Sequence, residues 1–114
     1  MHEASIVLSI LDLIISRCID EGYKSIESVK LRIGRASGIL PEALIFGFDA
    51  AKAETIASSA SLLIDIVPLG GFCSGCNNDF EVDESYALRC PLCGSGSFKI
   101  NKGYEMEVVE MEVD

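Results

Sequence analysis

The sequence predicts an α+β fold in which two helices pack on a three-stranded sheet, with a cysteine-rich subdomain inserted before the last strand. Three observations carry this prediction. Two segments repeat apolar residues every three or four positions, three segments alternate apolar and polar residues, and two Cys-x-x-Cys pairs precede the last alternating segment. The two periods are typical of amphipathic helices and of half-buried strands.

The first helix is expected over residues 6–19, where apolar side chains fall at three- and four-residue spacing. These side chains are Val7, Ile10, Leu11, Ile14, Ile15 and Cys18. Gly22 then ends the helix. A second helix is expected to begin at Pro41, because proline suits the first helical turn, and its apolar face runs to about Glu54.

Three strands are expected, over residues 29–33, 62–66 and 104–113. Val29, Leu31 and Ile33 alternate with charged residues, and a second alternation stops at Pro68. In the last strand the alternation reverses its phase, which requires an inserted residue. We therefore predict a bulge near Val108 or Val109.

Length and charge limit the class of protein. A chain of 114 residues, 49% hydrophobic and 24% charged, supports one modest core. A net charge of −9 without a Lys/Arg cluster argues against nucleic acid as a partner. The apolar run 4–15 is too short and too polar to span a membrane, and no basic region marks a signal peptide. We expect a cytoplasmic protein without a membrane partner.

Four cysteines form the clearest motif. Cys73 and Cys76 are separated by thirteen residues from Cys90 and Cys93. Two such knuckles can bring four thiolates onto one tetrahedral ion, with zinc as the default, and would leave no open position for catalytic water. Two disulfides or an iron centre of the rubredoxin type are the alternatives. We expect a zinc-ribbon-like subdomain over residues 70–97, inserted into an α/β domain of residues 1–69 plus 98–114.

The other cysteine and the only histidine lie elsewhere. Cys18 falls on the apolar side of the first helix, where we expect a small hydrophobic side chain. His2 follows the starting methionine, and the Met1 amine, the His2 amide nitrogen and the His2 Nδ1 can close two chelate rings. Glu3 could add a fourth ligand through its backbone or its side chain. Such a nitrogen-rich, square-planar set suits Ni(II) or Cu(II). Alternatively, His2 and Glu3 are only a polar lead into the helix.

Several motifs together resemble the HypA/HybF family of hydrogenase nickel-incorporation proteins. They are MHEAS, LRIGRASGILPEAL, the knuckles CSGC and CPLCG, and the closing GYEMEVVEMEV, in this order over nearly the whole chain. The chain departs from the family pattern at Ala4, where a leucine is usual, and at GYEM, where the family more often ends in Glu-Leu. These departures concern packing rather than metal ligands.

The resemblance implies a metallochaperone. It implies that Met1, His2 and Glu3 bind nickel and that Cys73, Cys76, Cys90 and Cys93 bind zinc. The implied partners are a GTPase of the HypB type and the large subunit of [NiFe] hydrogenase, and some family members also serve urease. A homodimer is compatible with the resemblance, which does not decide the oligomeric state.

Two other classes of function compete with the nickel carrier. One is a zinc-ribbon interaction module without metal transfer, and the other is a small rubredoxin-like electron carrier. We expect no enzyme, because the sequence lacks a Ser/His/Asp set and a phosphate-binding loop with its lysine.

Overall fold

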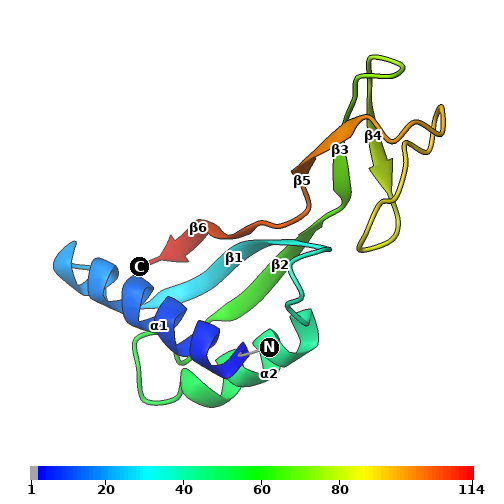
Figure 1. Cartoon of the computed structure of the whole chain (residues 1–114). Helices are drawn as coiled ribbons and strands as arrows, with labels where there is room; N and C mark the ends of the chain where they lie inside the picture. The colour runs from blue at the N-terminus through cyan, green and yellow to red at the C-terminus, as the bar shows by residue number, and fades with distance from the viewer. Residues whose placement is uncertain (1–2) are drawn as a thin grey trace. The chain divides into compact units, whose positions relative to one another are not determined.

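The computed structural model describes residues 3–114, which form two helices and six strands (Figure 1). In chain order these are α1 (Glu3–Asp20), β1 (Ile26–Gly34), α2 (Pro41–Ala51), β2 (Ser61–Val67), β3 (Leu69–Cys73), β4 (Asn78–Val82), β5 (Phe98–Lys102) and β6 (Met106–Val113). The predicted helices and the three predicted strands correspond to α1, α2, β1, β2 and β6. The α+β class is confirmed.

The strands form two three-stranded sheets, with the orders β2-β1-β6 and β4-β3-β5. In the first sheet, β1 and β2 run in the same direction. The Ile26 amide donates to the Ile56 carbonyl before β2 begins, and the Arg35 amide donates to the Val67 carbonyl at its end. Helix α2 is therefore the crossover that two parallel strands need.

Helix α1 buries one stripe of side chains. Val7, Leu11, Ile14 and Cys18 are all at most 4% exposed. They are spaced by four, three and four residues, which places them on one face of a helix. Cys18 is thus a buried small hydrophobic residue, as predicted.

Helix α2 ends at Ala51, three residues before the predicted end. Glu54 adopts a φ of 63°, which is left-handed backbone and cannot continue a right-handed helix. Leu44 and Phe48 carry the buried face of α2. The spacing of apolar residues alone does not locate such an end, because the end depends on where the backbone leaves the helical conformation.

The second sheet is small and surrounds the cysteines. Strand β3 pairs antiparallel with β4 and with β5. Its core contains Cys73, Phe80 and Cys90, and the rings of Phe80 and Phe98 meet edge to face, with centroids 5.6 Å apart. The alternating patterns of the sequence predict neither β3 nor β5.

The described chain divides into two compact units, each with its own packing. The first contains residues 3–31, 39–64 and 108–114, and the second contains residues 32–38 and 65–107. The division at residues 70 and 97 stays a prediction. Neither helix within residues 3–114 has the length and apolar character needed to cross a membrane.

Candidate metal centre

Two turns of the second unit carry the four cysteines. Cys73 is the last residue of β3 and Cys76 lies in the turn that leads to β4, whereas Cys90 and Cys93 lie in the loop before β5. Backbone hydrogen bonds hold the turns in place. The Ser74 amide donates to the Ser97 carbonyl at 2.9 Å, and the Cys90 amide donates to the Ser95 carbonyl at 2.8 Å.

Both turns close in the same way. The residue after the second cysteine of each knuckle adopts left-handed backbone, with a φ of 56° at Asn77 and 78° at Gly94. Asparagine and glycine are the residues that tolerate this conformation best. The two turns thereby bring both cysteines of each Cys-x-x-Cys pair to the same side of the loop.

The four sulfur atoms gather at one point. The Sγ atoms of Cys73 and Cys93 are 3.6 Å apart, those of Cys76 and Cys90 are 3.9 Å apart, and all four lie within 4.8 Å of one another. A tetrahedron with Zn–S bonds of about 2.3 Å has sulfur atoms about 3.8 Å apart. All four cysteines are free of disulfides. This geometry fits one four-thiolate ion better than two disulfides.

The surroundings of Cys90 favour its thiolate. Burial raises the pKa of this thiol, but hydrogen bonds from the backbone amides of Leu92 and Cys93 and from the side chains of Cys73 and Cys93 together lower the pKa to about 7. At Cys93, the Ser95 amide lowers the pKa, while burial and the neighbouring cysteines raise it to about 12. Cys90 is therefore more easily ionised than Cys93, and a bound cation would favour the thiolate form of its ligands.

The cluster is a closed site rather than an open one. Cys73 and Cys90 are buried, Cys76 is half-buried, and Cys93 lies at the surface. If all four thiolates bind one ion, no position remains for a reacting water molecule, as in structural zinc sites. The donor set fits zinc and also fits a single iron, so the thiolates alone do not identify the metal.

The amino-terminal residues are the other predicted site. Met1 and His2 lie outside the described residues. Glu3 begins α1, and its Oε2 accepts a hydrogen bond from the Leu40 amide at 3.1 Å. The sequence analysis did not foresee this contact, because nothing in the pattern around Glu3 points to a backbone amide 37 residues away.

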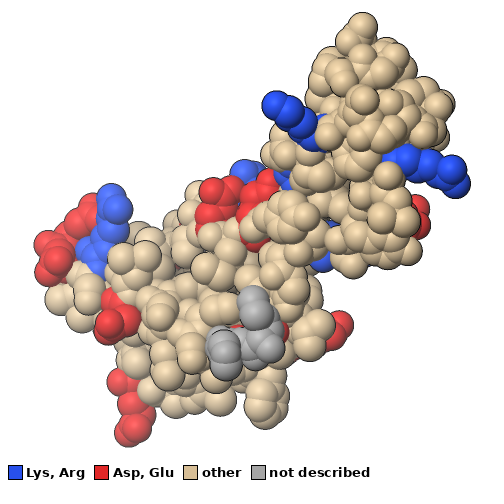
Figure 2. Space-filling model, viewed as in Figure 1, with Lys and Arg blue, Asp and Glu red and all other residues tan. Residues whose placement is uncertain are grey.

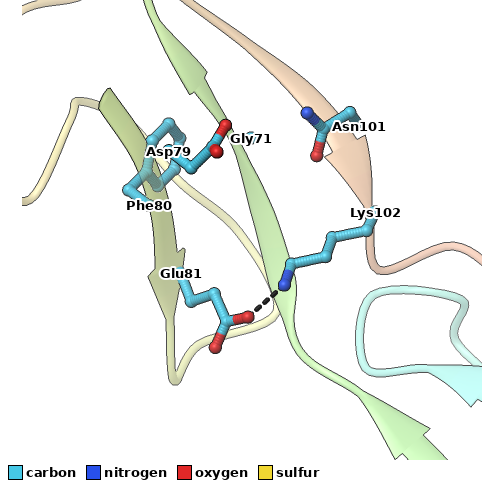
Figure 3. A pocket seen from close by; sticks show the side chains of 6 residues that line it. All are labelled: Gly71, Asp79, Phe80, Glu81, Asn101 and Lys102. Atoms are coloured by element: carbon cyan, nitrogen blue, oxygen red, sulfur yellow. Dashed lines mark hydrogen bonds and ion pairs between the residues drawn. The ribbon is translucent and has the colours of Figure 1, made fainter. Parts of the chain in front are cut away.

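A polar hollow lies on the small sheet of the second unit. It is lined by Gly71, Asp79, Phe80, Glu81, Asn101 and Lys102. Figure 3 shows Lys102 reaching from β5 toward Glu81 on β4, with which it forms an ion pair. The lining contains no histidine, serine or cysteine. Among residues 3–114, only the four cysteines form a group able to hold a metal ion.

Comparison with known families decides what kind of protein carries this centre. Residues 1–113 match the family described as "HypA: Hydrogenase/urease nickel incorporation, metallochaperone, hypA". The chain belongs to the HypA family. This family is one of nickel-incorporation metallochaperones, as the sequence motifs indicated.

Individual members of the HypA family are similar over their whole length. The hydrogenase maturation factor HypA of Chlorobium luteolum is 43% identical over 114 residues, which cover all of this chain and 97% of the relative. That of Methylocella silvestris is 38% identical and is covered completely. The nickel metallochaperone HypA of Helicobacter pylori, solved in solution, has a TM-score of 0.67 at 26% identity and covers 99% of this chain and 97% of its own. A second solution structure of a HypA protein has a TM-score of 0.72 at 25% identity, with coverages of 99% and 96%.

Proposed function

We propose that this protein is a nickel metallochaperone that binds Ni(II) at its amino terminus and delivers it during the maturation of [NiFe] hydrogenase. The observation that carries the proposal is the family match, which begins at residue 1 and continues to residue 113. It therefore includes the amino-terminal segment as well as the cysteine knuckles. The similarity to a solved nickel metallochaperone of the same fold supports it.

The proposed nickel site consists of Met1, His2 and Glu3. The terminal amine, the His2 amide nitrogen and the His2 Nδ1 would form two adjacent chelate rings. Ni(II) prefers such nitrogen ligands in a planar arrangement, whereas a tetrahedral thiolate set suits zinc. A chelate at the end of a chain also suits a carrier, because an acceptor can replace its ligands one at a time.

The second metal in the proposal is a zinc ion that stays with the protein. Cys73, Cys76, Cys90 and Cys93 would hold it, and their separations fit its bond lengths. The core around these cysteines is small, and its buried residues are Cys73, Phe80 and Cys90. Zinc binding would therefore supply folding free energy, on the order of 10 kcal/mol in comparable peptides.

The proposed partners are a GTPase of the HypB type and the large subunit of the hydrogenase, and the proposed compartment is the cytoplasm. In this scheme the protein carries the ion and catalyses no reaction, and any nucleotide hydrolysis belongs to the GTPase. Relatives named as hydrogenase maturation factors support the hydrogenase as the final acceptor.

The test is a calorimetric titration of zinc-loaded protein with Ni(II), compared with His2→Ala. The proposal predicts about one tightly bound nickel ion for the native chain and loss of that binding in His2→Ala. Asp12→Asn is the matched control, since Asp12 is an exposed carboxylate of α1 outside the proposed site. Equal nickel binding by all three proteins would contradict the proposal.

One observation favours a second function, that of an interaction module without nickel transfer. Large apolar side chains near the cysteines are exposed to solvent, with Tyr86 at 62%, Leu88 at 82% and Leu92 at 62%. Exposed apolar groups at a rigid metal-held loop suit a protein contact. In this alternative, His2→Ala supports hydrogenase maturation in cells as well as the native chain does, whereas Leu88→Ser does not.

A further inference from the structure

The carboxylate of Glu3 is attached to the start of a different helix. Glu3 is the first residue of α1, and its Oε2 lies 3.1 Å from the backbone nitrogen of Leu40. Leu40 is the residue that precedes α2, with φ −90° and ψ 115°. The contact therefore joins the beginnings of two helices that are distant in the sequence.

Helix α2 cannot provide this contact from its own residues. The first backbone amides of a helix have no partner within the helix. In a capping box, a Glu or Gln at the third helical position reaches back to the amide of the N-cap residue. Here that third position is Ala43, and Leu40 offers no side-chain acceptor. Glu3 of α1 supplies the missing carboxylate. The macrodipole of α2 also favours a negative charge at the start of α2.

Packing further along both helices keeps them close together. A Cβ added to Gly47 of α2 would lie 3.4 Å from Val7 Cγ2 of α1. Glu3, Ala4 and Phe46 line one groove between the same two helices. The start of α1 is thus fixed against α2 both by this packing and by the Glu3 carboxylate.

We propose that the Glu3 carboxylate is a positioning residue for the nickel terminus and contributes no nickel ligand. By binding the Leu40 amide, it fixes the direction in which the chain leaves the first turn of α1, and hence where the residues before it can assemble around an ion. The carboxylate stays with Leu40 when nickel binds. This inference rests on the proposed nickel site and assigns the role of the Glu3 side chain within it.

Two substitutions separate a positioning carboxylate from a nickel ligand. Glu3→Gln keeps a side-chain oxygen that can accept the Leu40 amide, but an amide oxygen is a poor ligand for Ni(II). Glu3→Ala removes both abilities. We measure the nickel affinity of zinc-loaded protein by calorimetry, the visible absorption spectrum of the nickel complex, and the urea midpoint without nickel.

The proposal predicts that Glu3→Ala lowers the nickel affinity about tenfold, as loss of a supporting contact to a metal site does, and lowers the urea midpoint. Glu3→Gln keeps the hydrogen bond to Leu40 and restores most of both losses, and only the small interaction of the charge with the helix macrodipole is missing. All three proteins give the same nickel spectrum, because their ligands are the same. Glu42→Ala is the control for charge, since Glu42 lies in the first turn of α2. It should bind nickel as the native chain does.

Several results would overturn the inference. If Glu3→Gln loses as much affinity as Glu3→Ala and the spectrum shifts, the carboxylate is a ligand. If Glu42→Ala loses as much affinity as Glu3→Ala, the effect is one of net charge. Full affinity in Glu3→Ala, together with loss in His2→Ala, overturns the positioning role alone. Nickel binding that survives His2→Ala overturns the proposed function and, with it, this inference.

Discussion

Gly70 in β3 lies beneath an ion pair that joins the two neighbouring strands. It pairs with Glu81 on β4 and with Lys102 on β5, and these two side chains form an ion pair across β3. Figure 3 shows this ion pair. A Cβ at this position would lie 2.6 Å from Lys102 Cε and 2.6 Å from the Phe80 carbonyl oxygen. A side chain here would therefore have to displace both the ion pair and a strand.

Gly70→Ala should lower the stability of the zinc-loaded protein by about 1–3 kcal/mol, the usual cost of inserting a methyl group into a filled space. The free energy of unfolding is measured in urea. Gly96→Ala is the matched control, because an added Cβ there would meet no atom within 4 Å. Equal stability of the two variants would show that the space above Gly70 is not filled.

Cys18 differs from the other four cysteines in its surroundings. It is 2% exposed on α1, and burial raises its pKa, followed by the effect of the nearby Glu21, while Arg17 lowers it. A thiol with a raised pKa stays protonated near neutral pH and reacts slowly. Its contribution to stability is complete below the unfolded pKa of about 8.5 and is lost as the pH rises through the folded value.

Thiol titration at pH 8 should distinguish the cysteines by their environment. With a metal bound, all five should react slowly with a thiol reagent. After chelation, the surroundings that shift the pKa values of the four clustered cysteines are lost with the structure of their unit, so these four should react quickly, while Cys18 remains protected until the helices unfold. Mass spectrometry of the labelled peptides identifies the protected residue. Rapid labelling of Cys18 in the folded protein would contradict its burial.

At the scale of elements, the phase reversal in the last strand is a feature that the sequence pattern predicts. Ser28 contacts Glu112 and Lys30 contacts Glu110, a step of two residues on each strand. The next contact, Arg32 with Glu107, advances two residues on β1 but three on β6. These contacts support the bulge predicted near Val108 or Val109. On a half-buried strand, the order of polar and apolar residues shows which side chains face the core. The bulge could therefore be predicted from the sequence.

Strands β3 and β5 could not be predicted from the same kind of pattern. Strand β3 is LGGFC, and both glycines are buried because they face neighbouring strands at close range. Glycine usually indicates a turn rather than the interior of a strand, so the Gly70–Gly71 pair does not predict a strand here. Strand β5 is only five residues long. Their pairing depends on tertiary contacts around the cysteines.

Removal of the metal should therefore destabilise the strands β3, β4 and β5 and leave the helices α1 and α2 folded. With zinc chelated, the backbone amides of β3, β4 and β5 should lose most of their protection from hydrogen exchange, because a small core remains. The amides of α1 and α2 should keep theirs, since those helices bury more apolar side chains. Hydrogen exchange followed by mass spectrometry measures both. Loss of protection in α1 and α2 to the same extent would show that the two units unfold together.

At the scale of the whole molecule, acidic charge is concentrated in the first unit. This unit has 11 acidic and 4 basic side chains, whereas the second has 7 and 5. On the face drawn in Figure 2, several basic side chains project from the surface. This concentration is hard to see in the sequence. The acidic residues within 108–114 belong to the first unit but are remote in sequence from the rest of it. A negative surface raises the local concentration of cations such as Ni(II).

The candidate sites differ in how much the sequence could predict of them. The spacing of the four cysteines predicted their convergence, because two knuckles have few ways to satisfy one ion. The contact between Glu3 and Leu40 could not be predicted, since it depends on how α1 packs on α2. The amino-terminal nickel site rests on the chelating chemistry of its residues and on the HypA family.

The most direct test of the account is the nickel stoichiometry of the native chain beside a version with one extra residue before Met1. The added residue moves the amine away from His2 and breaks the terminal chelate, while it leaves the fold and the four cysteines unchanged. The account predicts about one nickel ion per native chain and loss of tight binding in the extended chain. Equal binding by both would contradict an amino-terminal nickel site.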